Sequence, residues 1–406
     1  MGVKLKHVSE PGRRALVLAA ERNRKMATSA HAFVRGSTSR FYDWLANANS
    51  NALPEGPETW ICGDCHVGNL GPVASTGGAL AVQIRDLDQT VIGNPAHDLI
   101  RLGLSLAMAS RGSDLPGVTT AHMLERMIEG YEAAFKPETG PTAAGGEVVP
   151  TPISVVLRRA AGRSWKHLAD ERIEGTAPSI PLGKRFWPLS AEEREAVDTL
   201  FADEELHLLV TSLRSRSAKA KLRVLDAAYW VKGCSSLGRL RLAVLVSVDH
   251  GKAERHCLID IKEAVTARAP RSPSAIMPAN NGERVVTGAR NLSPFLGSRM
   301  LAARLLGKSI FVRELLPQDL KLEIEQVTRE EAMGIAQFLA GVVGTAHARQ
   351  LGPSDRARWI AELQRNRSKS LDAPSWLWNS VVDLVAAHEA AYLQHCRRYA
   401  LDGQAA

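Results

Sequence analysis

Residues 63–69 have the sequence Gly63-Asp64-Cys65-His66-Val67-Gly68-Asn69, directly after an apolar segment, residues 59–62, that predicts a short strand. Asp64 and Asn69 are separated by four residues. An aspartate can accept a proton in catalysis, and an amide oxygen can bind a hard cation such as Mg²⁺. Gly, Asp and Asn also favour turns for backbone reasons, so this segment on its own predicts an ordinary turn more readily than a site.

A second acidic segment strengthens the functional interpretation. Asp86 and Asp88 follow an apolar segment, residues 79–84, that predicts another strand, and Asp86 lies seventeen residues after Asn69. Two aspartates spaced by one residue can both face a cation where a strand has given way to a turn. Mg²⁺ at phosphoryl-transfer sites takes one or two side-chain oxygens in addition to the phosphates. The two segments together favour a metal site made by Asn69, Asp86 and Asp88.

The combined motifs resemble those of aminoglycoside and choline kinases. In these enzymes a catalytic loop is followed by a metal-binding aspartate and then by a Gly-Asp-Pro turn that leads into a buried helix. The matching residues here are Gly63, Asp64, His66, Gly68, Asn69, Asp86, Leu87, Asp88, Gly93, Asn94, Pro95, Asp98 and Leu99. Asn94 departs from the pattern, because an aspartate usually stands there.

The resemblance implies a role for each main position. Asp64 would be the catalytic base and His66 the histidine of the catalytic loop. Asn69 and Asp86 would bind Mg²⁺, and Asp98 would brace the loop. In kinases the aspartate accepts the proton of the substrate hydroxyl, while Mg²⁺ neutralises the phosphates of ATP.

Most of the chain also resembles a second family, the bacterial domain of unknown function 2252. The similar stretches are residues 26–36, 63–71, 85–101, 233–245, 261–264, 284–286 and 346–349. This family name carries no activity, so the expected chemistry rests on the kinase motifs.

A kinase also needs a small β-rich lobe, and the strand-like alternation of residues 223–264 offers one downstream of the catalytic loop. A turn of small residues between two of these strands predicts a phosphate-binding loop. Its residues would be Gly233, Ser235, Ser236 and Gly238. Lys262, on the third predicted strand, would pair with phosphate oxygens, and Glu283, or alternatively Glu263, would hold the lysine. A hairpin turn and a lysine that reaches water are the ordinary alternatives.

This order of segments predicts an α+β, protein-kinase-like fold of two lobes that is circularly permuted, with a large helical lobe and a small β-rich lobe. The expected segments are N-terminal helices at residues 1–57, a catalytic-loop segment at 58–204, a nucleotide-binding lobe at 205–328, and C-terminal helices at 329–406. The first, second and last would make the helical lobe. Permutation predicts that residue 347 lies near residue 60 and that Lys262 lies near Asp86.

The expected function is an ATP- and Mg²⁺-dependent phosphotransferase that acts on a hydroxyl of a small molecule. One alternative is a non-catalytic nucleotide-binding protein. Another is a phosphatase of the haloacid-dehalogenase type with Asp86 as nucleophile, because Asp86, Asp88 and Thr90 resemble its first motif. That fold requires successive parallel strands.

Composition and charge limit the kind of protein and the partners that can be expected. Hydrophobic residues make up 45% of the chain and charged residues 23%, which is typical of a globular protein. No apolar stretch approaches the roughly 18 residues of a spanning helix, and no apolar segment follows the basic N-terminus, so a cytoplasmic protein without a membrane partner is expected. The net charge of +8 attracts anions. No basic run is interleaved with aromatic residues, so a nucleic-acid partner is not expected.

The five cysteines are expected to be reduced thiols. Cys62, Cys65 and His66 have the spacing of a c-type haem attachment site, a chemistry that is normally completed outside the cytoplasm. Zinc would need further ligands at suitable spacing. A redox role of Cys62 and Cys65 stays open.

Overall fold

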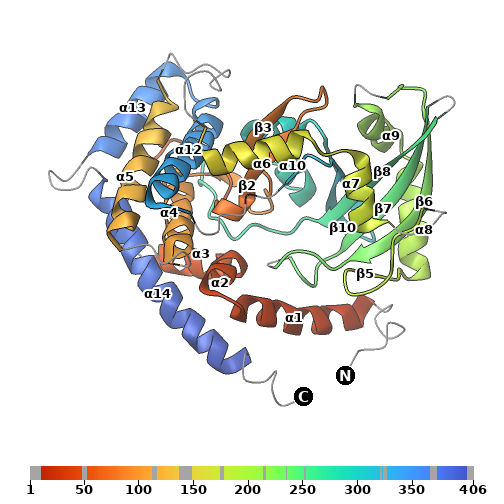
Figure 1. Cartoon of the computed structure of the whole chain (residues 1–406), viewed down its shortest axis with the longest axis horizontal. Coiled ribbons are helices and arrows are strands. Elements are labelled where there is room, and N and C mark those ends of the chain that lie inside the picture. Colours follow the sequence, from red (N-terminus) through yellow and green to blue (C-terminus); the bar gives the residue numbers. More distant parts are fainter. Residues whose placement is uncertain are drawn as a thin grey trace.

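The structure, a computed structural model, describes residues 11–47, 53–111, 117–136, 149–173, 178–213, 216–234, 236–250, 253–320, 322, 327–365 and 373–399. It is mixed α+β, as the sequence predicts, with an antiparallel sheet at one side and most of the long helices at the other (Figure 1). Among the described residues, none of the helices combines the length and the apolar character that crossing a membrane requires.

A six-stranded antiparallel sheet forms the β-rich lobe. Its strand order is β5 (Phe186–Trp187), β6 (Lys221–Trp230), β7 (Arg241–His250), β8 (Ala253–Glu263), β10 (Lys308–Leu315) and β9 (Met300–Leu305). Side chains alternate between the two faces of a strand. Ile259 and Ile261 of β8 therefore join a core that includes α8 (Ala191–Phe201) and α9 (Glu204–Thr211). Leu258 joins a separate core on the opposite face of the sheet. The side chains of Asp260 and Lys262 lie on this same face of β8.

The helical lobe combines residues from both ends of the chain. Its helices are α4 (Ala96–Arg111), α5 (Gly117–Ala133), α12 (Arg329–Ala348), α13 (Pro353–Gln364) and α14 (Ser375–Tyr399). Two small antiparallel sheets precede α4, namely β1 (Thr59–Ile61) with β4 (Val91–Gly93) and β2 (Leu70–Ala74) with β3 (Leu80–Ile84). Buried side chains from these elements share one continuous hydrophobic core.

The remaining helices lie between or along the two lobes. They are α1 (Pro11–Ala27), α2 (Ala30–Gly36), α3 (Thr38–Asn47), α6 (Thr151–Ala161), α7 (Trp165–Arg172), α10 (Asn281–Leu292) and α11 (Pro294–Gly297). Leu18 of α1 is buried in the core of the β-rich lobe, while the hydroxyl of Tyr392 in α14 donates to the carbonyl of Ala27 at 3.2 Å. The helix α1 therefore runs along one edge of the molecule from the sheet to α14 (Figure 1).

The two halves of the helical lobe meet beside β1. Gln350, just after α12, accepts a hydrogen bond from the backbone N–H of Trp60 at 2.8 Å, and its Nε2 donates to the carbonyl of Trp60 at 3.1 Å. The prediction that residue 347 lies near residue 60 is confirmed, because Gln350, three residues further along the chain, contacts Trp60 across 290 positions.

The close approach of α5 and α12 generates a first prediction. A Cβ added at Gly130 of α5 would lie 2.1 Å from the carbonyl oxygen of Gln337 in α12, whereas one added at Gly117, at the start of the same helix, would meet nothing within 4 Å. We expect Gly130→Ala to lower the free energy of unfolding by about 1–3 kcal/mol, because two backbones must separate. Gly117→Ala should change it by no more than about 0.5 kcal/mol. Urea unfolding of the two variants measures the difference, and equal stabilities would contradict it.

Candidate functional site

The segment after β1 is held by the first turn of α4. Asp98 Oδ2 accepts a hydrogen bond from the backbone N–H of Cys62 at 2.7 Å, and Oδ1 accepts one from Gly63 at 2.9 Å. Asp98 is almost completely buried. Hydrogen bonds between backbone N–H groups and an ionised carboxylate are short and strong. Asp98 therefore fixes the point at which the loop of residues 63–69 begins.

A chain of buried hydrogen bonds extends from Asp98 into three other helices. His347 Nε2 lies 3.2 Å from Asp98 Oδ2, and His347 Nδ1 lies 2.9 Å from the hydroxyl of Tyr131. Trp359 Nε1 donates to the same hydroxyl at 3.1 Å. Because a carboxylate accepts hydrogen bonds, we assign the His347 ring proton to Nε2, which donates to Asp98, and the Tyr131 hydroxyl then donates to Nδ1 while it accepts from Trp359. The loop anchor is thus connected to α5, α12 and α13.

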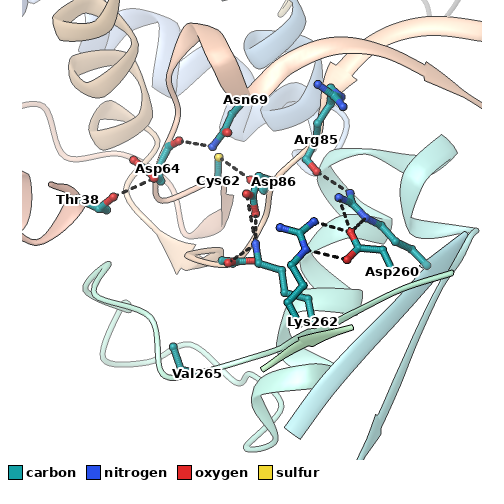
Figure 2. Close-up of polar contacts among 12 residues, drawn as sticks. Thr38, Cys62, Asp64, Asn69, Arg85, Asp86, Asp260, Lys262 and Val265 are labelled. Carbon is teal, nitrogen blue, oxygen red and sulfur yellow. Dashed lines mark hydrogen bonds and ion pairs between the residues drawn. The ribbon is translucent and has the colours of Figure 1, made fainter. Parts of the chain in front are cut away.

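Asp64 lies inside this loop, and both of its carboxylate oxygens have partners. Thr38 Oγ1 donates to Oδ2 at 2.9 Å (Figure 2), and Arg101 Nε donates to Oδ1 at 3.0 Å. Burial raises the pKa of Asp64 above its ordinary value, and the charge of Arg101 acts against this shift. Asn69 Nδ2 donates to the carbonyl of Asp64 at 2.8 Å. The amide oxygen of Asn69 is consequently the atom suited to bind a cation.

Lys262 joins the sheet to the acidic segment after β3 (Figure 2). Its Nζ lies 3.2 Å from Asp86 Oδ1 and 2.5 Å from Asp88 Oδ2. The side chain of Lys262 is 3% exposed, whereas that of Asp86 is 47% exposed, so solvent or a ligand reaches the pair from the side of Asp86. The prediction that Lys262 lies near Asp86 is confirmed.

The two carboxylates that share Lys262 differ in their pKa. Although burial acts to raise it, the charge of Lys262 holds the pKa of Asp86 well below its ordinary value. Burial, followed by the negative charge of Asp86, raises the pKa of Asp88 to about 6. One lysine therefore compensates the first carboxylate better than the second. A bound divalent cation would favour the ionised form of both.

Beside Lys262, on the same face of β8, Asp260 is fully buried and pairs with two arginines. Arg241 holds its carboxylate in a bidentate pair at 2.9 and 2.6 Å, and Arg313 lies 3.3 Å from Oδ2. Arg313 Nη1 also donates to the carbonyl of Arg85 at 3.0 Å (Figure 2). The strand β10 thereby contacts the acidic segment directly. Sequence analysis assigned no role to Asp260, Arg241 or Arg313.

The turn predicted to bind phosphate lies between β6 and β7. Gly233 and Gly238 have φ angles of 98° and 95°, in the left-handed region that favours glycine. Ser236 is buried, and Ser235 lies outside the described residues. The glycines therefore have a structural reason to be there, whether or not the turn binds phosphate.

Glu283 is exposed on the first turn of α10, and Glu263 accepts hydrogen bonds from Lys308 and from the backbone N–H of Leu240. The ion pairs of Lys262 within the described chain are with the two aspartates. His66 is buried, and burial lowers its pKa well below the ordinary value, so its ring is neutral at pH 7.

The cysteines of the loop are closed to solvent. Cys62 and Cys65 are both fully buried free thiols. A hydrogen bond with Cys65, followed by burial, raises the pKa of the Cys62 thiol well above its ordinary value. A thiol that stays protonated is a poor nucleophile, so this environment does not favour a redox role.

Arg101 and Arg284 are two further arginines of the site that were not predicted from the sequence. Arg101 lies one helical turn after Asp98, so both side chains face the loop, and a charged residue at this spacing in an apolar helix was the available signal. Arg284 of α10 donates from Nη2 to the carbonyls of Asp88 and Val265 at 3.0 and 2.9 Å. Nothing in the local pattern of α10 indicated this contact.

The donors fit Mg²⁺ that arrives with phosphates better than a metal bound by protein alone. Within the ranges that the structure describes, no group of three or more His, Cys, Asp and Glu side chains could hold a metal. The oxygens of Asp86, Asp88 and the Asn69 amide are hard donors of the kind that Mg²⁺ prefers. Mg²⁺ is commonly held by one or two carboxylates plus phosphate oxygens, and these residues match that kind of site.

The shared lysine generates a second prediction. Lys262→Met would leave Asp86 and Asp88 facing each other without a cation. We expect a loss of about 1–3 kcal/mol in the free energy of unfolding at pH 8, less than for a fully buried pair because Asp86 is half-exposed. The loss should shrink at pH 5. Without Lys262, Asp86 and Asp88 bind protons more tightly in the folded state than in the unfolded state. The stability of the variant relative to the wild type therefore rises as pH falls.

Lys308→Met is the matched control. Lys308 pairs with Glu263 on the neighbouring strand and is 47% exposed, so its loss should cost less than about 1 kcal/mol at either pH. Thermal and urea unfolding at both pH values measure these effects. An equal loss for Lys262→Met at pH 5 and pH 8 would show that the carboxylates do not depend on the lysine.

Comparison with known proteins gives one match. A family model described as an uncharacterized protein conserved in bacteria (DUF2252) matches residues 14–398. No curated protein and no solved structure matches the chain. The match spans both lobes and every element that positions the site, and the chain therefore belongs to the DUF2252 family of bacterial proteins.

Proposed function

We propose that the protein is an ATP-dependent phosphotransferase that transfers a phosphoryl group to a hydroxyl of a small molecule. The observation that carries the proposal is the meeting of Lys262 with Asp86 and Asp88, at 3.2 and 2.5 Å, beside the loop that holds Asp64 and Asn69. Phosphoryl transfer is mainly positioning and neutralisation of phosphate charge, and it needs this combination of a lysine, metal-binding oxygens and an aspartate.

The order of elements in the β-rich lobe supports the proposal. The small-residue turn joins β6 to β7, Lys262 lies on the next strand, β8, and the helix α10 follows. Kinases likewise place a glycine-rich loop over the phosphates and the phosphate-binding lysine on the third strand. Here this lobe follows the catalytic loop in sequence, and we propose that the fold is a circularly permuted form of the kinase fold.

Each site residue receives a role under this proposal. Asp86, Asp88 and the amide oxygen of Asn69 would hold Mg²⁺, which neutralises the triphosphate and frees Lys262 to contact phosphate oxygens. Asp64 would orient the acceptor hydroxyl. Its oxygens bind Thr38 and Arg101, but each carboxylate oxygen has two lone pairs and can accept a second hydrogen bond.

A non-catalytic nucleotide-binding protein is a second candidate, and one observation favours it. Arg101 already pairs with Asp64 at 3.0 Å, and this pair makes Asp64 a weaker base than an equally buried carboxylate without an arginine partner. The phosphatase alternative receives less support. It needs parallel strands around Asp86, whereas every strand pair in the described chain is antiparallel.

Phosphate transfer from ATP tests the proposal. The purified protein is incubated with γ-labelled ATP, Mg²⁺ and a panel of sugars, amino sugars, amino alcohols and nucleosides. We expect Asp64→Asn to lower kcat by about 10²-fold or more while ATP binding persists. Asp86→Asn should abolish the Mg²⁺ dependence of nucleotide binding. Asp198→Asn, an exposed position on α8, is the control and should change neither kcat nor the Mg²⁺ dependence of nucleotide binding.

The outcomes separate the candidates. ATP binding without label transfer to any acceptor or to water would favour the non-catalytic protein. Transfer that is unaffected by both Asp64→Asn and Asp86→Asn would place the reaction elsewhere. Release of phosphate from phosphomonoesters without ATP would support the phosphatase.

A further inference from the structure

A basic pocket lies between the two lobes, next to the proposed site. Its volume is about 70 Å³, and about 10–15 Å³ suffices for a single water molecule, so there is room for a small anion. The pocket reaches from Val73 of β2 to the turn after β6, and α7 closes one side. Arg85, which precedes Asp86, is part of its wall.

The charges that line this pocket do not balance. Its cationic residues are Arg85, Arg163, Arg172, Lys232 and Arg313, and its acidic residues are Glu171 and Asp319.

Both acidic residues already have arginine partners. Glu171 pairs with Arg163 at 2.7 Å, and Asp319 pairs with the buried Arg299 at 3.1 Å. Arg313 shares Asp260 with Arg241. Positive charge therefore remains uncompensated in the pocket.

Three cationic side chains lie against Trp230 of β6. Lys232 Nζ lies 4.1 Å from the centre of the indole ring, and the guanidinium carbons of Arg172 and Arg241 each lie 5.0 Å from it. Arg172 Nε is buried without a hydrogen-bond partner among the described residues. Burial, followed by the charge of Arg241, lowers the pKa of Lys232 well below its ordinary value. Cation–π contacts hold these side chains but do not cancel their charge.

We propose that this pocket is a binding site for a phosphate or carboxylate group, held by Lys232 and Arg172 with Arg313 and Arg85 beside it. An anion would compensate the positive charge around Trp230, whereas a neutral purine ring would not. The proposal stands on the pocket itself and does not require the protein to be a kinase.

Inorganic phosphate is the probe for the test. Isothermal titration of phosphate into the full chain, at low salt and without nucleotide or metal, should give one binding site. Lys232→Met and Arg172→Met, which keep long side chains over Trp230, should each weaken binding about tenfold or more. Lys232→Arg should retain it. Lys166→Met is the control, because Lys166 is an exposed residue on the same helix, α7, and should have no effect.

Thermal unfolding shows whether a variant has merely lost its fold. Without phosphate, Lys232→Met should unfold at the same temperature as the wild type or higher, because no carboxylate partner is lost. Phosphate should raise the unfolding temperature of the wild type and not that of Lys232→Met. Absence of phosphate binding by the wild type, or binding that both Met variants retain, would overturn the proposal.

Competition with Mg²⁺–ATP then identifies the source of the anionic group. Displacement of phosphate by Mg²⁺–ATP would assign the pocket to a phosphate of the nucleotide. Simultaneous binding would assign it to an anionic acceptor molecule. Asp64→Asn should leave phosphate binding unchanged, so a failure of the phosphotransfer assay and a failure of the anion site give different results.

Discussion

The ion pairs of Lys262 with Asp86 and Asp88 constrain the rest of the structure, because they join residues of different lobes that are 176 and 174 positions apart. Lys262 does not act alone. Arg284 of α10 binds the carbonyls of Asp88 and Thr90, and Arg313 of β10 binds the carbonyl of Arg85. Cations from a strand, a helix and a second strand therefore hold the same short segment. The relative position of the two lobes is set at the segment that carries the proposed metal ligands.

This arrangement links stability and ligand binding through charge. The residues of the sheet that face the helical lobe include the cations Arg241, Lys262 and Arg313. The two arginines share a single carboxylate, that of Asp260. The segment after β3 adds two carboxylates, and the pKa of one, Asp88, is raised to about 6 by burial and by the negative charge of Asp86. A metal ion beside Asp86 and an anion beside Lys232 would each relieve a separate imbalance. The Mg²⁺–phosphate ligand that the proposed function requires carries both kinds of charge.

The sequence predicted the parts of the site that follow local rules. Asp64 and Asn69 come after a strand, Asp86 ends another, and Asp98 opens a buried helix, so each could be recognised from its neighbours. Lys262 was found because it follows an apolar run that predicts a strand. The partners were not found, because Arg284 and Arg313 act across large separations and nothing local marks them, while the only local sign of Arg101 is its charge within an apolar helix. The packing of α7 beside the pocket was also beyond prediction, since its Leu168 joins a core formed mostly by distant strands.

The contact between Gln350 and Trp60 explains how the proposed permutation is compatible with the packing of the helical lobe. Gln350 makes two hydrogen bonds to the backbone of one residue of β1, so the end of α12 and the start of the loop segment are aligned without a peptide link. His347, three residues earlier, reaches Asp98, which holds the same loop. Closing a longer loop costs little, about 0.6 kcal/mol for each doubling of its length. Side-chain contacts at the junction can therefore preserve a site whose parts have been reordered along the chain.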